Sequence, residues 1–136
     1  VSVQAQVLNL LKKLQAKHML TYLFISHNLS VVRYMADTVA IMYLGRIVEY
    51  GTVEEVMCSS KHPYTQALLS AVPTVDTESQ REVIRLQGDQ GSPIDPPSGC
   101  PFHPRCPQAE SRCSQQLPEQ QWVSETHHAT CLLLKG

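Results

Sequence analysis

Residues 20–44, LTYLFISHNLSVVRYMADTVAIMYL, place two apolar runs on either side of a short segment that begins with polar residues. Residues 20–26 are mostly apolar and rich in aromatic and β-branched side chains, which is typical of a strand covered on both faces in a parallel sheet. Asn28 can cap a short helix. Residues 38–44 then predict a second buried strand. The stretch therefore indicates an α/β fold in which helices and strands alternate.

The segments on either side extend this predicted body. Upstream, residues 3–17 carry apolar side chains at helical spacing, opposite a face of Gln and Lys. Downstream, Gly45 and Arg46 suit a two-residue hairpin turn with glycine first. Residues 47–50 are therefore expected to return as an antiparallel strand that ends at Gly51. A parallel core with this added hairpin predicts a mixed sheet.

Two further helices are predicted after the hairpin. Thr52 and Glu55 have the spacing of a capping box, in which each side chain binds the backbone of the other, and they open a short helix ending at Cys58. We expect Cys58 to be a small buried side chain. Residues 62–64, HPY, begin the next helix because proline suits the first helical position, and the tyrosine is expected to pack against the body.

Net charge and apolar run length exclude two classes of protein. The 136 residues contain 11 Lys and Arg against 12 Asp and Glu, and no stretch concentrates enough cations to neutralise many phosphates. A nucleic-acid partner is therefore not expected. The longest apolar runs fall far short of the roughly 20 residues that span a bilayer, and no signal-peptide pattern is present. These features predict a soluble intracellular protein.

Four of the five cysteines follow residue 99. An odd number of cysteines fits a disulfide framework poorly and favours a metal or cluster site. Gaps of five, six and seventeen residues between them match neither zinc knuckles nor ferredoxin runs, so spacing leaves three alternatives open: a [4Fe-4S] cluster, zinc, or two disulfides. Zinc could use all four thiolates, or His103 could replace one of them. His127 and His128 are ligands by type but are expected to be surface residues. The four candidate ligands are Cys100, Cys106, Cys113 and Cys131.

Four segments in this order resemble the C-terminal half of the ATP-binding subunit of oligopeptide and dipeptide ABC importers, and together they cover nearly the whole chain. They are residues 1–15 (VSVQAQVLNLLKKLQ), 20–51, 62–73 (HPYTQALLSAVP) and 99–113 (GCPFHPRCPQAESRC). FISHNLSVV, residues 24–32, is similar to the switch-histidine segment of all ABC ATPases. The HPY segment and the proline-rich cysteine tail resemble the peptide-importer subfamily in particular.

The resemblance implies a partial P-loop NTPase (ABC ATPase) sheet with helices, followed by an irregular cysteine-bearing C-terminal tail. It divides the chain into four parts. Residues 1–58 correspond to the C-terminal part of the ATPase domain and residues 59–86 to a helical extension. Residues 87–98 form a linker rich in Gly, Pro, Asp and Ser, and residues 99–136 form the cysteine-rich tail. Residues 81–86 are expected to form a short edge strand.

Specific residues acquire expected roles from the same resemblance. His27 matches the switch histidine, which positions the γ-phosphate and the attacking water, an electrostatic contribution typical of phosphoryl transfer. Val1 and Ser2 correspond to the last residues of the D-loop, which crosses the dimer interface. Asn28 stands where many relatives carry Asp, and as a helix cap it serves equally well.

The family pattern also contains elements that this sequence lacks. No G-x-x-x-x-G-K-[ST] loop, glycine-rich signature or apolar strand ending in Asp-Glu occurs. We therefore expect a fragment of the energy-coupling subunit that does not hydrolyse ATP alone and self-associates. The complete subunit is expected to use ATP and Mg²⁺ and to pair with a second ABC ATPase subunit and transmembrane permease subunits on the cytoplasmic face of the membrane. The alternative is a non-catalytic regulatory module that binds a metal or cluster.

For the cysteine tail, the resemblance implies a [4Fe-4S] cluster held by the four cysteines named above, with zinc as the alternative. Four thiolates satisfy the ligand requirement of such a cluster, and a cluster would give a tail poor in core residues a fixed conformation. His103 and Arg105 lie beside the predicted ligands in the sequence. They could adjust the centre through hydrogen bonds, although surface exposure would also account for both.

Overall fold

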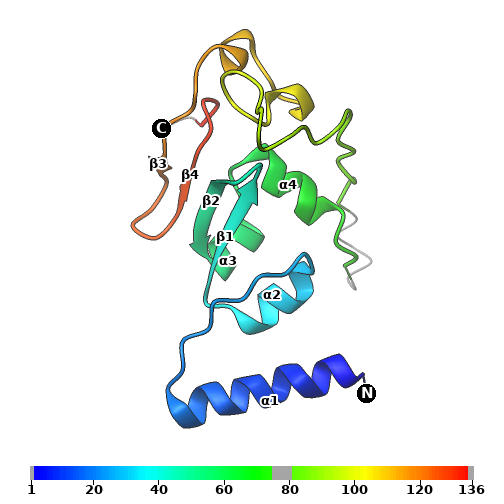
Figure 1. Ribbon diagram of the computed structural model, residues 1–136, viewed down its shortest axis with the longest axis vertical. Coiled ribbons are helices and arrows are strands. Elements are labelled where there is room, and N and C mark those ends of the chain that lie inside the picture. The colour runs from blue at the N-terminus through cyan, green and yellow to red at the C-terminus, as the bar shows by residue number, and fades with distance from the viewer. Residues whose placement is uncertain (1, 75–80, 135–136) are drawn as a thin grey trace. The chain divides into compact units, whose positions relative to one another are not determined.

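The computed structural model describes residues 2–74 and 81–134. Its contacts divide the chain into two compact units, Val1–Asp37 and Thr38–Gly136 (Figure 1). The first unit contains helices α1 and α2, and every strand within the described residues belongs to the second. Among the described residues, no helix is long and apolar enough to cross a membrane.

Both helices of the first unit begin at side-chain caps. In α1 (Val3–His18) the Ser2 side chain accepts a hydrogen bond from the backbone N–H of Ala5. In α2 (Leu29–Met35) the Asn28 side chain accepts from the N–H groups of two residues in the first turn. Such caps bind N–H groups that have no partner within the helix. The predicted helix over residues 3–17 and the predicted Asn28 cap are confirmed.

Residues 20–26 do not form the predicted core strand. The segment is extended without ladder pairing, and the side chains of Leu23 and Ile25 are 93% and 91% exposed. A hydrogen bond connects this segment to α1: the Tyr22 hydroxyl donates to the Leu11 carbonyl at 2.9 Å. The expectation of a parallel strand is wrong for this structure, because a strand requires a neighbour that pairs with its backbone and no described segment does so.

The second unit is built on a four-stranded sheet in the order β1-β2-β4-β3 (Figure 1). Its strands are β1 (Thr38–Tyr43), β2 (Arg46–Thr52), β3 (Gln121–Trp122) and β4 (His128–Ala129). All described pairings are antiparallel, so the mixed sheet predicted from the sequence is corrected. The pairing of β4 with β2 brings part of residues 99–136, here called the cysteine segment, into the same sheet as the β1–β2 hairpin.

The hairpin turn lies one residue earlier than predicted. Leu44 and Gly45 form the turn, with φ values of 46° and 76°, whereas Arg46 already belongs to β2. Two central residues with positive φ match the twist of the flanking strands, which explains why a two-residue hairpin selects this turn. Leu44 therefore has a positive φ, which is unfavourable for a residue with a side chain, and Gly45 occupies the second turn position. The second strand also continues past Gly51 to Thr52.

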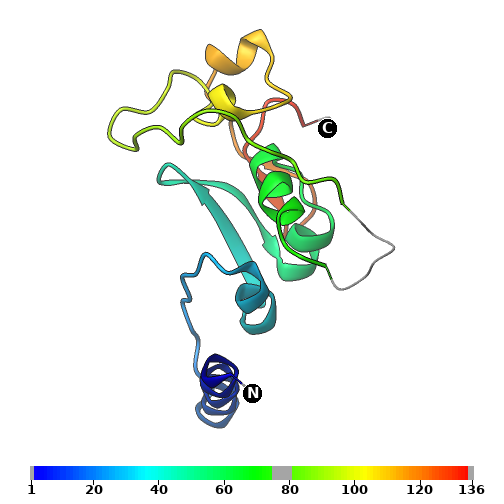
Figure 2. The same ribbon diagram turned by 90° about the vertical axis from the view of Figure 1, so that its right-hand side faces the viewer.

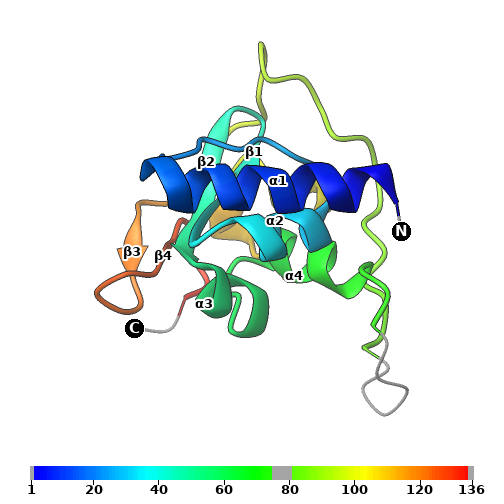
Figure 3. The same cartoon turned by 90° about the horizontal axis from the view of Figure 1, so that it is seen from below.

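Helices α3 (Val53–Cys58) and α4 (Pro63–Ser70) lie on one side of the β1–β2 hairpin (Figures 2 and 3). The predicted capping box is confirmed: the Thr52 hydroxyl accepts the Glu55 N–H, and the Glu55 carboxylate accepts the Thr52 N–H at 2.9 Å. Cys58 ends α3 but is exposed, which corrects the expectation of a buried thiol. The cause is its position on the solvent side of the last helical turn.

The rest of the described chain contains little regular structure. Helix α4 ends at Ser70, three residues before Pro73. Residues 81–86 form no strand, so the predicted edge strand is wrong, and residues 87–98 contain no helix or strand. Two short 3₁₀ helices, His103–Arg105 and Ser111–Ser114, shape the cysteine segment.

An aromatic cluster joins three parts of the second unit. Tyr43 of β1 is in edge contact with Tyr64 of α4, with ring centroids 4.8 Å apart, and with Phe102 of the cysteine segment at 5.2 Å. Tyr64 and Phe102 also contact each other at 5.4 Å. Tyr43 and Phe102 are buried. The expectation that Tyr64 packs against the body is confirmed, and Phe102 anchors the cysteine segment to that body.

A buried carboxylate ties three segments together. Glu49 of β2 has no exposed surface, and its Oε1 accepts the Lys61 N–H and the His127 Nε2–H, each at 2.7 Å. Its Oε2 accepts the His62 N–H at 3.0 Å. The expectation that His127 lies at the surface is wrong, because its pairing with Glu49 compensates for burial. The neighbouring His128 is half-buried and stacks on Tyr50.

Replacing Glu49 tests this arrangement. Glu49→Ala leaves two backbone N–H groups and a histidine without their buried acceptor, so we expect it to lower the free energy of unfolding by about 3–5 kcal/mol. Urea denaturation followed by circular dichroism measures the change. Glu54→Ala, which removes an exposed carboxylate from α3, serves as the matched control and should change stability by less than about 0.5 kcal/mol. Equal effects of the two substitutions would contradict the interpretation.

Candidate functional site

His27 lies in a bend between the extended segment 20–26 and α2, and its side chain is exposed. The backbone on its C-terminal side is fixed by hydrogen bonds. The Ser26 hydroxyl accepts the Asn28 N–H at 3.0 Å, and the Asn28 side chain in turn caps α2. The turn therefore holds the backbone at this position while the imidazole remains accessible to a ligand.

Val1 and Ser2 were predicted to be the end of a D-loop. Val1 lies outside the described residues. Ser2 is exposed and caps α1 through its bond with the Ala5 N–H at 3.2 Å. The helix cap is by itself a sufficient reason for a serine at this position, because a hydroxyl side chain is among the preferred caps. A role for Ser2 at a dimer interface stays a prediction.

The four predicted cysteine ligands line one small cavity. Two of them lie in the segment before the 3₁₀ helix Ser111–Ser114, one lies within this helix, and the fourth follows β4. The space between them is about 10 Å³, close to the volume that one water probe occupies. Two of the thiols are buried and two are partly buried. The residues that share this cavity are Cys100, Cys106, Cys113, Cys131, His62, Pro63, Phe102, His103, Leu132 and Leu133.

Burial is the main cause of raised pKa values at three of these thiols, and the neighbouring thiols add to it. Burial raises the pKa of Cys106, the neighbouring thiols of Cys131, Cys100 and Cys113 add to the rise, and the Gln108 N–H opposes it. Burial likewise raises the pKa of the Cys100 thiol and that of the Cys131 thiol. The raised pKa values keep the thiols of Cys100, Cys106 and Cys131 protonated near neutral pH, and binding of a metal centre would release protons.

Backbone N–H groups point at the sulfur atoms. The Leu133 N–H donates to Cys131 Sγ, and the Glu110 N–H donates to Cys113 Sγ, each at 3.4 Å. Such donors favour the thiolate form over the thiol. All five cysteines are free thiols. Within the described parts of the chain, no three His, Cys, Asp or Glu side chains are grouped closely enough to hold a metal ion.

Gly99 permits the two halves of the cysteine segment to approach each other. Its φ is +71°, and a Cβ at this position would lie 2.4 Å from the Cys113 carbonyl oxygen and 2.6 Å from the Ser114 carbonyl carbon. The Cys100 N–H donates to the same Cys113 oxygen at 2.8 Å. Only glycine fits this position without strain. Sequence reasoning missed this requirement, since the only local signal was a glycine directly before a cysteine.

His62 connects the start of α4 with the cysteine cavity. Its side chain is 1% exposed, and its Nδ1 accepts the Tyr64 N–H at 3.1 Å as the cap of α4. Burial lowers the pKa of His62 to about 4, although the Glu49 carboxylate acts to raise it. The expectation that HPY marks a helix start is confirmed. The histidine also borders the cysteines, which sequence reasoning did not predict.

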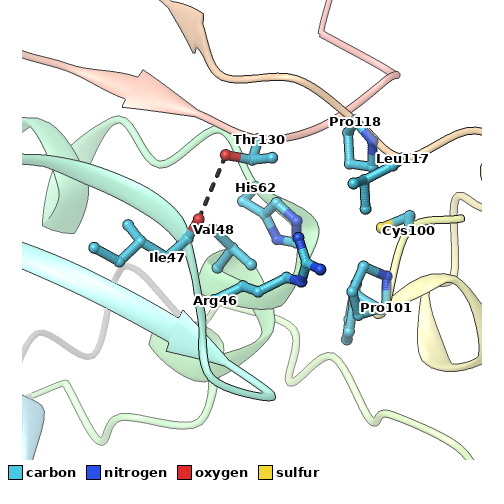
Figure 4. A pocket seen from close by; sticks show the side chains of 10 residues that line it. Arg46, Ile47, Val48, His62, Cys100, Pro101, Leu117, Pro118 and Thr130 are labelled. Atoms are coloured by element: carbon cyan, nitrogen blue, oxygen red, sulfur yellow. Dashed lines mark hydrogen bonds between the residues drawn. The ribbon is translucent and has the colours of Figure 1, made fainter. Parts of the chain in front are cut away.

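A second cavity of about 80 Å³ lies beside the first (Figure 4). Its wall includes Arg46 and Val48 of β2, the imidazole of His62, and the segment that carries Cys100 and Pro101. Thr130 closes another side, and its hydroxyl lies 3.4 Å from the Ile47 carbonyl. The cavity therefore separates β2 from the cysteine segment at the position where His62 reaches between them.

Comparison with known proteins identifies the class of protein. The family model for the C-terminal region of oligopeptide/dipeptide transporters matches residues 48–113. The oligopeptide transport ATP-binding protein AppF of Bacillus subtilis is 49% identical over 98% of this chain and 41% of its own length. The di/tripeptide transport ATP-binding protein DppF of Pseudomonas aeruginosa is 47% identical over 95% of this chain and 41% of its own. The dipeptide transport ATP-binding protein DppF of Haemophilus influenzae is 52% identical over 87% and 36%.

These relatives are named as ATP-binding proteins of peptide transport. The family match over residues 48–113 includes most of β2, the HPY helix and three of the four clustered cysteines. Within this class the chain belongs to the oligopeptide/dipeptide transporter family, whose C-terminal region it contains. It spans about two fifths of the length of the first two of these relatives. The predicted resemblance is thus confirmed at the level of the family.

Alanine at residue 99 tests whether glycine is required by the close approach of Gly99 to the backbone of Cys113 and Ser114. We expect Gly99→Ala to reduce stability by about 1–3 kcal/mol more than Gly88→Ala, because overpacking against a fixed backbone adds to the strain of a positive φ. Gly88 is the matched control: its φ is +80°, and a Cβ there meets nothing within 4 Å. Urea denaturation gives the difference, and thiol modification should become faster at the displaced cysteines. Identical losses for both variants would count against a requirement for close approach.

Proposed function

We propose that this chain is the C-terminal part of the ATP-hydrolysing, energy-coupling subunit of an oligopeptide or dipeptide ABC importer. The family match over residues 48–113 carries the proposal, and peptide-transport ATP-binding proteins that align along almost the whole chain support it. ATP and Mg²⁺ are the proposed cofactors of the complete subunit. The residues that would hold them are outside this sequence, so the chain alone is expected to show no ATP hydrolysis.

His27 is the proposed switch histidine of that subunit. Its exposed imidazole and its position at the end of an extended segment, next to a capped helix, support the assignment. A ring held there could donate one hydrogen bond to a γ-phosphate oxygen while its other nitrogen orients water. Stabilisation of this kind acts on charge that develops in the transition state. We also propose that Val1 and Ser2 lie at the interface with the second ATPase subunit; this rests on the resemblance of residues 1–15 to the family, since Val1 is outside the described residues.

The proposed partners are a second ABC ATPase subunit and transmembrane permease subunits at the cytoplasmic face of the membrane. Relatives named as transport ATP-binding proteins support a permease partner. Self-association of the chain by itself stays a prediction. The alternative, a non-catalytic regulatory module, would leave His27 without a reaction to serve, and the substitution described next distinguishes the two.

Replacing His27 tests the catalytic assignment. In the complete subunit assembled with its permease, His27→Ala should lower kcat for ATP hydrolysis on the order of 100-fold while the Kd for ATP stays within about threefold, because the imidazole acts on the transition state. Steady-state hydrolysis and nucleotide titration measure the two quantities. His18→Ala, at an exposed histidine of α1, should match the wild type. Unchanged turnover in the His27 variant refutes the proposed role.

We also propose that Cys100, Cys106, Cys113 and Cys131 hold a [4Fe-4S] cluster in the natural protein. Two features support this: the four thiols line one cavity, and backbone N–H groups donate to two of the sulfur atoms, those of Cys113 and Cys131. A bound cluster would supply a rigid covalent link among segments that otherwise have little regular structure. In the described residues the thiols are not grouped closely enough to hold a metal ion and the cavity is about 10 Å³, so binding would require the cysteine segments and the side chains around the cavity to move.

Metal analysis of anaerobically prepared complete subunit tests the cluster. We expect iron and acid-labile sulfide at about four each per chain, and an electron paramagnetic resonance signal on reduction. Ser substitution of any one of the four cysteines should reduce the iron content. Cys58→Ser is the control, because this exposed cysteine lies outside the cavity. Stoichiometric zinc without iron would refute the cluster and favour the zinc alternative.

A further inference from the structure

We propose that the cavity of about 80 Å³ between β2 and the cysteine segment is a binding site for a short aliphatic monocarboxylate. The Arg46 guanidinium and the Nε2–H group of His62 bind the carboxylate, and the apolar part of the wall binds the hydrocarbon tail. The inference goes beyond the proposed ATPase function. It needs neither a metal nor a cluster, because every group that it uses is a side chain lining this cavity.

The first observation is the charge of the cavity wall. The residues that line the cavity include one cation, Arg46, and no Asp or Glu. Arg46 is exposed, and within residues 2–74 and 81–134 its guanidinium forms no ion pair. A guanidinium has only donors to offer, and its planar fork matches the two oxygens of a carboxylate. The cavity is therefore suited to an anion and not to a cation.

The second observation is a buried donor in the same wall. His62 is 1% exposed, and its Nδ1 accepts the Tyr64 N–H at 3.1 Å, so the ring carries its proton on Nε2. Among the described residues Nε2 has no hydrogen-bond partner, yet it is not one of the polar atoms that the protein encloses completely. It therefore borders open space. Figure 4 shows the imidazole and the Arg46 guanidinium on the same side of the cavity.

The third observation is that acceptors near these donors are already used. The Val48 carbonyl accepts the Thr130 N–H at 2.8 Å, and the Ile47 carbonyl accepts the Thr130 hydroxyl at 3.4 Å. The Glu49 carboxylate is not part of the wall, and it is bound by two backbone N–H groups and by His127. An ammonium group would meet no carboxylate in the described wall. The site therefore favours a simple acid over an amine or a zwitterionic amino acid.

The fourth observation is the size and the apolar character of the remaining wall. The cavity has room for about five to eight water molecules, and thus for a small organic acid such as isovalerate. Burial of its hydrocarbon tail is favourable, whereas phosphate would meet apolar side chains and a single cation. The residues with hydrocarbon side chains in the wall are Ile47, Val48, Pro101, Phe102, Leu117 and Pro118.

Calorimetric titration of the complete subunit with isovalerate tests the site. We expect one molecule to bind per chain with a Kd on the order of 1 mM, because a small ligand gains limited affinity from each of its atoms. Arg46→Gln should raise this Kd by at least about tenfold, since the charge-assisted pair is lost. Arg33→Gln, at an exposed arginine of α2 that does not line the cavity, is the matched control and should bind like the wild type.

Replacing His62 tests the second donor. Asn is a favourable helix cap, so His62→Asn can still accept the Tyr64 N–H, but it no longer presents an N–H group to the cavity. We expect the Kd for isovalerate to rise by about tenfold, as for the loss of a hydrogen bond to a charged group. The unfolding temperature without ligand, measured for the same variant, shows whether the cap is preserved.

Chemical protection locates the site in the wild type, without any substitution. Phenylglyoxal modifies accessible guanidinium groups, and mass spectrometry of the digested subunit gives the rate at each arginine. Isovalerate should slow the modification of Arg46 and leave that of Arg33 unchanged. Isoamyl alcohol, which has the tail without the charge, and acetate, which lacks most of the tail, should protect Arg46 less.

The outcomes separate this inference from the proposed function. Absence of both binding and protection with isovalerate overturns the site, and an unchanged Kd in Arg46→Gln overturns the assignment of its carboxylate partner. Equal protection by acetate or by isoamyl alcohol overturns the proposed ligand class. N-acetylvaline presents the same groups as the C-terminus of a peptide, and tighter binding of this compound overturns the assignment to a free acid. A complete subunit that binds isovalerate but does not hydrolyse ATP refutes the proposed function and leaves the site in place.

Discussion

The buried carboxylate of Glu49 is the interaction on which the second unit depends. It accepts hydrogen bonds from the backbone before α4 and from His127 beside β4, so one side chain of β2 binds two segments that are distant in sequence. A buried carboxylate without such donors is strongly disfavoured. The fold that satisfies Glu49 therefore also fixes where α4 begins and where β4 pairs with β2.

A second carboxylate secures the same region from the outside. Glu55 accepts the Thr52 N–H and the hydroxyls of Ser124 and Thr126, and these bonds lower the pKa of Glu55 to about 2. Since the pKa in the folded state is below the ordinary value, the ionised form is stabilised by folding. That contribution is present above the ordinary pKa of about 4.5 and is lost as the pH falls toward 2. At neutral pH both glutamates hold the loop after β3 against the body.

Local features of the fold were predictable from the sequence, and non-local ones were not. The caps at Asn28 and Thr52 and the start of α4 depend on residues within three positions of each other, and all were confirmed. The strand over residues 20–26 failed because an apolar run cannot reveal whether a partner strand is present. His127 was assigned to the surface because its partner lies 78 positions away.

The candidate site follows the same division. The four cysteines could be selected from the sequence because thiols are common metal ligands. The cavity that they share depends on the close approach at Gly99 and on the packing of Phe102 against Tyr43, and neither can be read from the spacing of the cysteines. His62 contributes both to the fold and to the cysteine cavity. Its N–H binds Glu49, its Nδ1 caps α4, and its ring borders Cys100. A change at the cysteine centre that moves this ring must act on the helix cap and on the buried carboxylate, because all three share one residue.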